Sequence, residues 1–237
     1  MRSSVLSALL LLAASSPALA QPRAVIELFT SQGCSSCPPA DRMMNGWADQ
    51  DDVVALTMPV DYWDYLGWKD TLASHDFTLR QRAYSEVRGD RNVYTPQVVI
   101  DGLIHAVGSN SPDIETAISQ ARDKAHVLSV PVAISGDKGG YTVAIAAGGA
   151  KGKVFVVPIS RQVKVAIGRG ENNGATITYS NVVRAMRPIG DYTGASLTLN
   201  LDAKAIAAPG ADGFAVLVQE MNAGRPSAIL GAALQRP

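Results

Sequence analysis

Two cysteines separated by two serines are the residues of this sequence best suited to chemistry. Cys34 and Cys37 are the only cysteines of the 237-residue chain. A disulfide between them closes a loop too short to remove much entropy from the unfolded chain, so stability explains the pair poorly. An apolar strand over residues 24–29 precedes them and a helix follows, which puts Cys34 near a helix N-terminus that favours a thiolate. The pattern predicts a redox-active disulfide in which Cys34 attacks and Cys37 resolves the mixed disulfide.

Two other uses of the cysteine pair stay open. Half of a zinc site would need further ligands, but the chain has no second C-x-x-C and its three histidines lack ligand spacing. A purely structural disulfide is the other alternative. We expect no metal centre and no cofactor beyond the disulfide itself.

The first twenty residues have the pattern of a secretory signal peptide. Arg2 is followed by an apolar run over residues 5–14 and by a small-x-small pattern at residues 18–20. The run is shorter than the roughly 20 residues that span a bilayer. Cleavage near Ala20 predicts a periplasmic or secreted protein without a membrane anchor. The charges balance at 21 basic and 21 acidic residues, so we expect no nucleic acid as a partner; the oligomeric state is not predicted.

The two halves of the mature chain differ in pattern. The first half alternates buried strands with amphipathic helices, and Asp101-Gly102 indicates a hairpin turn. The second half has short alternating runs separated by turns, which is typical of an antiparallel sandwich. We expect strands over residues 24–29, 53–58, 97–100 and 103–107, helices over 40–47, 74–87 and 111–121, and then strands over 128–135, 141–147, 153–159, 162–168, 175–186, 195–201, 213–220 and 228–234.

A strand, a C-x-x-C and a helix, followed later by Thr95-Pro96, a hairpin and a last helix, resemble the thioredoxin fold. The resemblance implies a cis Pro96 that, with Thr95, presents backbone to an extended substrate; an ordinary trans proline is the alternative. It also implies a carboxylate on the first strand that assists proton transfer. Glu27 matches if Gly33 counts as an extra turn residue, and a solvated strand-end carboxylate is the alternative.

The sequence also resembles a family of exported proteins, domain of unknown function 1223. Residues 27–41, 60–70 and 94–97 carry this resemblance, and residues 169–172 and 181–184 extend it over nearly the whole mature chain. The expected fold class is therefore an α/β thioredoxin-like N-terminal domain over residues 21–126 followed by an all-β antiparallel sandwich-like C-terminal domain over residues 127–237.

An aromatic loop follows the second expected strand. Its rings include Tyr62, Trp63 and Trp68, and loops at this edge of an α/β sheet form ligand crevices. We expect these rings to bind substrate, while packing against the underside of the loop is the alternative. A polar cluster around an Asn-Asn-Gly turn, at Arg169, Glu171, Asn172, Asn173, Arg184 and Arg187, either forms the turn or contacts another domain or a partner.

Two functions follow from these residues. The first is a periplasmic thiol–disulfide oxidoreductase acting on protein or small-molecule thiols and disulfides, with Cys34, Cys37 and Glu27 catalytic. The alternative is a non-catalytic binding protein on the same scaffold, for a protein partner or for a copper ion held by cysteines and a distant histidine such as His75 or His105.

Overall fold

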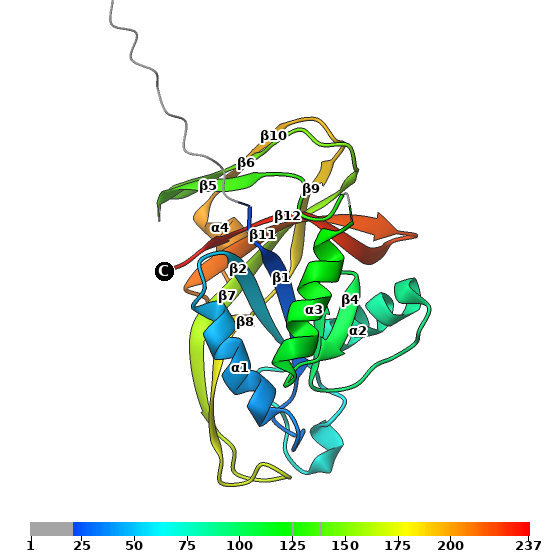
Figure 1. Cartoon of the computed structure of the whole chain (residues 1–237). Coiled ribbons are helices and arrows are strands. Elements are labelled where there is room, and N and C mark those ends of the chain that lie inside the picture. The colour runs from blue at the N-terminus through cyan, green and yellow to red at the C-terminus, as the bar shows by residue number, and fades with distance from the viewer. Residues whose placement is uncertain (1–20, 125, 138) are drawn as a thin grey trace, which may run out of the picture.

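The computed structural model describes residues 21–124, 126–137 and 139–237 (Figure 1). The predicted signal peptide over residues 1–20 lies outside the described residues. No helix within the described ranges is long and apolar enough to cross a membrane.

The first half of the chain forms the strands and helices that its patterns predict. Ser74 caps the second helix by accepting a hydrogen bond from the Asp76 backbone N–H, and Gly89 ends that helix with φ 78°. Asp101 and Gly102 both have positive φ in the predicted hairpin turn. The elements are β1 (Ala24–Thr30), α1 (Pro38–Ala48), β2 (Val53–Pro59), the 3-10 turn η1 (Asp64–Leu66), α2 (His75–Arg88), β3 (Gln97–Ile100), β4 (Ile104–Val107) and α3 (Ser111–Arg122).

The second half is mostly strand, with partners that local patterns do not reveal. One uninterrupted strand replaces the two expected over residues 153–159 and 162–168. Its first part pairs with residues 213–219 and its second part with residues 176–183. A strand over residues 187–192 and a short helix were not predicted. The elements are β5 (Val132–Asp137), β6 (Gly140–Ile145), β7 (Gly152–Ala166), β8 (Thr176–Val183), β9 (Arg187–Tyr192), β10 (Leu197–Leu201), α4 (Ala203–Ile206), β11 (Gly213–Asn222) and β12 (Arg225–Gln235).

The expected fold class, a thioredoxin-like α/β domain followed by a separate antiparallel sandwich, is wrong. Strands of both halves form one mixed nine-stranded sheet in the described chain, in the order β12-β11-β7-β8-β2-β1-β3-β4, with β9 also on β7. The junction is a parallel pairing of β2 with β8 at Thr57 and Val182, reinforced by a 2.6 Å hydrogen bond from the Thr57 hydroxyl to the Ser180 carbonyl. An unpaired β2 edge would leave backbone groups unsatisfied, and β8 covers it. The domain boundary at residue 126 stays a prediction.

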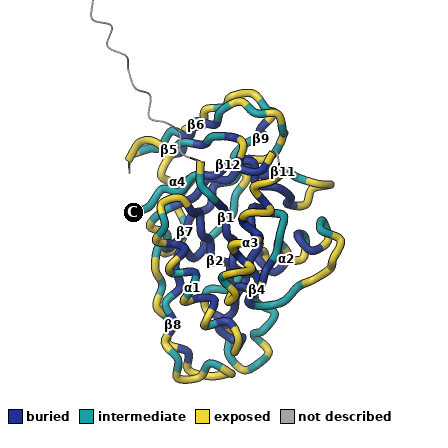
Figure 2. The backbone as a smooth tube through the Cα atoms, viewed as in Figure 1, coloured by how far each residue is buried: buried dark blue, intermediate teal, exposed yellow. Residues whose placement is uncertain are grey.

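Two hydrophobic layers enclose this sheet. Alternate residues of β1, Ile26 and Leu28, pack under α1 and α3, while Val25 and Phe29 face α2 and the other core. That second core continues beneath the small sheet β10-β6-β5. Figure 2 shows the buried strands running through the middle of the molecule, and Figure 1 shows the first turns of α1 at the same end as the loop between β7 and β8.

Candidate functional site

The two cysteines form a disulfide at the start of α1. Their Cα atoms are 5.4 Å apart, and Cys37 is the N-cap of the helix. Cys34 keeps 3% of its surface exposed, whereas Cys37 is fully buried. Cys34 is therefore the more accessible of the two cysteines, and the order of attack expected from the sequence stays a prediction.

The segment before β3 lies against the cysteine turn. The Thr95–Pro96 peptide bond is cis, which confirms that sequence expectation. The Ser36 hydroxyl lies 3.4 Å from both the Cys34 sulfur and the Thr95 carbonyl oxygen. Gly108 lies close to Pro96, because a Cβ there would be 3.2 Å from the Cβ of Pro96 and 2.9 Å from a methyl of Leu28. Thr95 and Pro96 are thus next to the disulfide, while their role in binding substrate stays a prediction.

Asp41 supplies the buried carboxyl of this site. It follows Cys37 by four residues, and Cys37 has helical backbone angles, so the two side chains share one helix face with Cβ atoms roughly 5–6 Å apart. The Thr30 hydroxyl donates a 2.7 Å hydrogen bond to one carboxyl oxygen, and the other has no partner among the described residues. Burial raises the pKa of Asp41 to about 8. The carboxyl therefore exchanges its proton close to neutral pH.

Sequence reasoning missed Asp41 in this role, because an acid in the first turn of a helix is explained by the helix dipole alone. The usable signal was its spacing of four residues from Cys37.

Glu27 is placed away from the cysteines. Alternation along β1 turns its side chain to the α2 face, opposite the residues that pack under α1. There its carboxylate accepts a 2.9 Å bond from Arg80 and a 2.5 Å bond from the Tyr84 hydroxyl, and Arg80 also donates to Gln219 of β11. This buried network ties β1 to α2 and β11, and it gives no support to the predicted proton-transfer role of Glu27.

The aromatic loop after β2 packs against the cysteine turn through Trp63. Its indole N–H donates a 2.8 Å bond to the Thr95 hydroxyl, and a Cβ on Gly33 would lie 3.1 Å from its Cβ. Tyr65 stacks on Trp63 with ring centroids 6.4 Å apart and is 76% exposed. Tyr62 instead donates to Gln81 of α2 at 3.2 Å, and burial raises its pKa to about 12. Trp63 and Tyr65 thus form a surface beside the disulfide, and Tyr62 is part of the packing.

The same loop fixes the residues between β1 and the cysteines. Asp70 accepts a 2.8 Å bond from the Gln32 backbone N–H, and the Trp68 indole donates to the Gln32 side chain at 2.8 Å. Burial raises the pKa of Asp70 to about 6. The Trp68 ring lies against Gly168 and its Cβ against Gly170 of the second half, so this predicted substrate residue mainly joins loops.

The polar cluster predicted near the Asn-Asn-Gly turn divides in two. Asn172 donates 2.9 Å bonds to the carbonyls of Gln32 and Cys34, which confirms the contact between halves. Arg184 and Arg187 lie elsewhere and donate to Ser160 and Ala205.

The histidines considered as copper ligands are held by carboxylates. His75 contacts Asp61 at 2.9 Å, and His105 lies between the Tyr94 hydroxyl at 2.8 Å and Asp90 at 3.2 Å. Within residues 21–124, 126–137 and 139–237, no group of three or more histidine, cysteine, aspartate or glutamate side chains is placed to hold a metal ion. The copper alternative stays a prediction.

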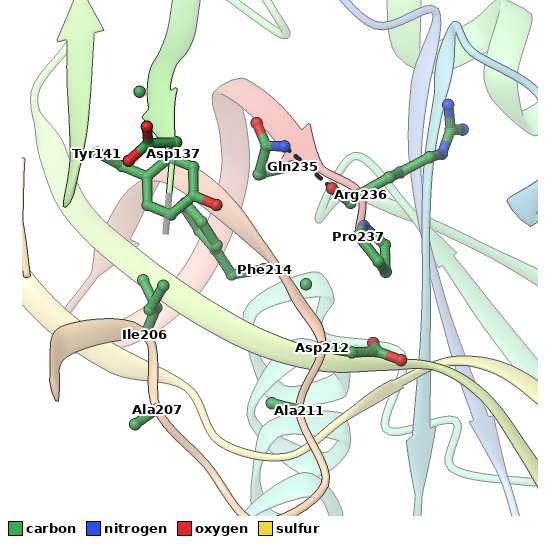
Figure 3. Close-up of a pocket in the computed structure, with 12 residues that line it drawn as sticks. Asp137, Tyr141, Ile206, Ala207, Ala211, Asp212, Phe214, Gln235, Arg236 and Pro237 are labelled. Atoms are coloured by element: carbon green, nitrogen blue, oxygen red, sulfur yellow. Dashed lines mark hydrogen bonds between the residues drawn. The ribbon is translucent and has the colours of Figure 1, made fainter. Parts of the chain in front are cut away.

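A separate pocket of about 630 Å³ lies near the C-terminus (Figure 3). Tyr141 packs edge-on against Phe214 there, with ring centroids 4.9 Å apart. Figure 3 shows the Arg236 side chain extending away from these rings, and its guanidinium bonds to the Gln50 carbonyl at 2.6 Å. No cysteine, Thr95 or Asp41 atom lines this pocket, so it is not part of the disulfide site.

Comparisons with known proteins cover most of the chain. The family model described as "Protein of unknown function (DUF1223)" matches residues 25–219. A crystal structure of a protein from Agrobacterium tumefaciens is 35% identical, with a TM-score of 0.83 over 91% of this chain and 95% of that one. HBP35 of Porphyromonas gingivalis, at 11% identity, shares the fold with a TM-score of 0.59 over 91% of this chain and 75% of its own. No curated protein sequence matches the chain.

Proposed function

The chain belongs to the DUF1223 family, and we propose from its own site that it is a thiol–disulfide oxidoreductase that uses Cys34 and Cys37 as its redox pair. The observation that carries the proposal is the placement of a barely accessible disulfide at a helix start, one helical turn from a buried carboxyl with a pKa of about 8. A structural disulfide needs no proton acceptor beside it. Redox exchange does, because each resolving step moves a proton.

The reaction is balanced by the groups present. In the reducing direction the Cys34 thiolate attacks a substrate disulfide, forms a mixed disulfide and releases one substrate thiolate, which takes a proton from solvent. Cys37 then passes its thiol proton to the Asp41 carboxylate and attacks the Cys34 sulfur. The Cys34–Cys37 bond forms and the second substrate thiolate leaves. Two electrons thus pass from the cysteines to the substrate.

Surrounding residues support this use of the pair. The Ser36 hydroxyl, 3.4 Å from the Cys34 sulfur, can donate a hydrogen bond to the thiolate. Trp63 and the exposed Tyr65 offer an aromatic surface beside Thr95, which suits extended polypeptides or apolar thiols. We include in the proposal a relationship to the thioredoxin superfamily confined to this local arrangement of strand, cysteine pair, helix and Thr95-Pro96. Action after export to the periplasm is also part of the proposal.

Single-cysteine variants test the proposal cleanly, because the chain holds only two cysteines. Cys37→Ser keeps the attacking thiol and should accumulate a stable mixed disulfide with an unfolded polypeptide that contains a disulfide or with a chromogenic aryl disulfide. Cys34→Ser is the matched control and should trap far less, since Cys37 is fully buried. The wild-type chain should catalyse reduction of insulin by a dithiol. Equal trapping by both variants, or a wild-type disulfide that dithiols cannot reduce in the folded protein, would refute the proposal.

A further inference from the structure

The loop between β7 and β8 contacts the cysteine turn from the second half of the chain. Besides the Asn172 bonds to Gln32 and Cys34, the Glu171 carboxylate accepts a 3.2 Å hydrogen bond from the Ser35 backbone N–H. Figure 1 shows this loop and the start of α1 at the same end of the molecule. A carboxylate is therefore bonded to the residue directly after Cys34.

We propose that Glu171 is a positioning residue that biases the Cys34–Cys37 pair toward its disulfide form, so that the protein acts as an electron donor to substrate disulfides. The inference rests on the proposed function and adds the direction of its chemistry, which the cysteine motif alone does not contain. The donation is the balanced step given above, with the substrate disulfide as oxidant and an external dithiol restoring the reduced pair.

The electrostatic argument concerns the reduced protein. A helix start favours a thiolate through unpaired N–H groups and the dipole. The Glu171 carboxylate accepts the hydrogen bond of the Ser35 N–H, so this donor next to Cys34 is not available to the thiolate. The carboxylate also places a negative charge near the position where the thiolate would carry its own. Like charges raise a thiol pKa, and a less stable thiolate makes the reduced pair a stronger reductant.

Asn172 has a different part in the same contact. Its neutral amide holds the carbonyls of Gln32 and Cys34, which fixes the turn in the orientation that directs the Ser35 N–H at Glu171. A change at Asn172 loosens the turn without altering its charge. A change at Glu171 alters the charge and leaves the amide clamp, so the two variants separate electrostatics from structure.

The effect should be modest because both Ser35 and Glu171 are exposed. Exposed charge interactions are worth a few tenths to about 1 kcal/mol, and salt screens them. We expect Glu171→Gln to lower the Cys34 thiol pKa by about half a unit and the disulfide equilibrium constant against glutathione about threefold. At 29.6 mV per tenfold change, threefold corresponds to about 14 mV toward a more oxidising pair.

The experiment uses the full mature chain equilibrated with mixtures of reduced and oxidised glutathione, with the oxidised fraction read by thiol alkylation. The Cys34 thiol pKa comes from the pH dependence of iodoacetamide alkylation of the reduced protein. Glu171→Lys should shift both readouts further in the direction of Glu171→Gln, and both shifts should shrink between about 0.02 and 0.5 M salt. Glu220→Gln, which removes a partly exposed carboxylate on β11, is the charge-matched control and should change neither.

Three outcomes decide the matter. Shifts that follow charge and shrink with salt support the proposal. Two results would show that the directional inference is wrong while the proposed oxidoreductase function stands, provided that the wild-type pair exchanges with glutathione. One is that Glu171→Gln and Glu171→Lys leave both readouts within 1.5-fold of wild type. The other is that Asn172→Ala produces the same shifts as the Glu171 variants, with no salt dependence. If the wild-type pair exchanges with neither glutathione nor dithiols, the proposed function itself fails.

Discussion

Replacing Asp41 with asparagine should change how the stability of the folded protein depends on pH. Burial raises the folded-state pKa of Asp41 from its ordinary value near 3.8 to about 8. Between these values the folded chain keeps a proton that the unfolded chain has lost, so the free energy of unfolding falls as pH rises, by about 1.4 kcal/mol per pH unit. Asparagine carries no such proton and can still accept the 2.7 Å bond from Thr30.

The difference in unfolding free energy between Asp41→Asn and wild type should therefore move in favour of the variant on going from pH 5 to pH 8. The expected change is on the order of 3 to 4 kcal/mol, since the two pKa values bracket most of that interval. Urea unfolding of the disulfide-intact chains at pH 5, 6, 7 and 8 measures it. Burial also raises the pKa of Asp70 to about 6 and of Asp101 to about 7. Asp101 is present in each chain and cancels in the difference, whereas Asp70, whose charge helps to raise the pKa of Asp41, is part of the measured effect.

An exposed carboxylate provides the control for this experiment. Asp76→Asn, at the start of α2, removes a solvent-facing acid, and its pH profile should run parallel to that of wild type. If the Asp41→Asn profile is also parallel to wild type, the pKa of Asp41 in the folded protein lies near its ordinary value. A carboxylate of such low basicity is a poor acceptor for the Cys37 thiol proton, so the argument for that role would be lost.

Three other substitutions test the remaining packing and contacts. Arg80→Met removes the cation that pairs with the buried Glu27 carboxylate, so it should lower the free energy of unfolding in urea by about 3–5 kcal/mol. The glutathione equilibrium of the cysteines should stay unchanged. A shifted equilibrium would contradict the separation of the two faces of β1. Trp63→Ala should lower turnover on disulfides of unfolded polypeptides, and this decrease should be several-fold larger than the decrease in turnover on a small aryl disulfide. Unchanged turnover on both substrates would remove the aromatic surface from the proposal. Gly102→Ala should lower the free energy of unfolding by more than about 2 kcal/mol, because its φ is +75° and a Cβ would overlap the β12 backbone. Gly89→Ala, with a similar φ and open space around it, should lower that free energy by only about 1 kcal/mol in the same assay. Equal losses would show that the turn after β3 does not press on β12.

Local elements were predictable because their signals are short-range. Ser74 and Gly89 bracket α2 as capping residues, and Asp101-Gly102 form the β3–β4 turn. Most strands of the second half also follow their alternating patterns. Their pairing does not, because a strand with one apolar face fits the edge of a distant sheet as well as the strand next to it in sequence. The pairing of β2 with β8 therefore could not be predicted from the sequence.

The candidate site divides in the same way. The Cys34–Cys37 disulfide and the cis bond before Pro96 follow from motifs that span a few residues. Glu27 was predicted as the proton-transfer carboxylate, but its side chain lies on the α2 face of β1, where it pairs with Arg80. The sequence around Glu27 does not indicate that this carboxylate pairs with Arg80, since Arg80 is 53 residues away.

The position of the disulfide depends on both halves of the chain. Gln32, two residues after the end of β1, is held from three directions: Asp70 accepts from its N–H, Trp68 donates to its side chain, and Asn172 donates to its carbonyl. Two of these partners come from the loop after β2 and one from the second half. The strand pairing of β2 with β8 keeps the last of them in reach, since Asn172 lies in the loop that leads into β8. The long strands β7 and β8 therefore do more than extend a sheet: they bring a carboxylate and an amide to the backbone of the cysteine turn, where we propose that the carboxylate shifts the balance between dithiol and disulfide.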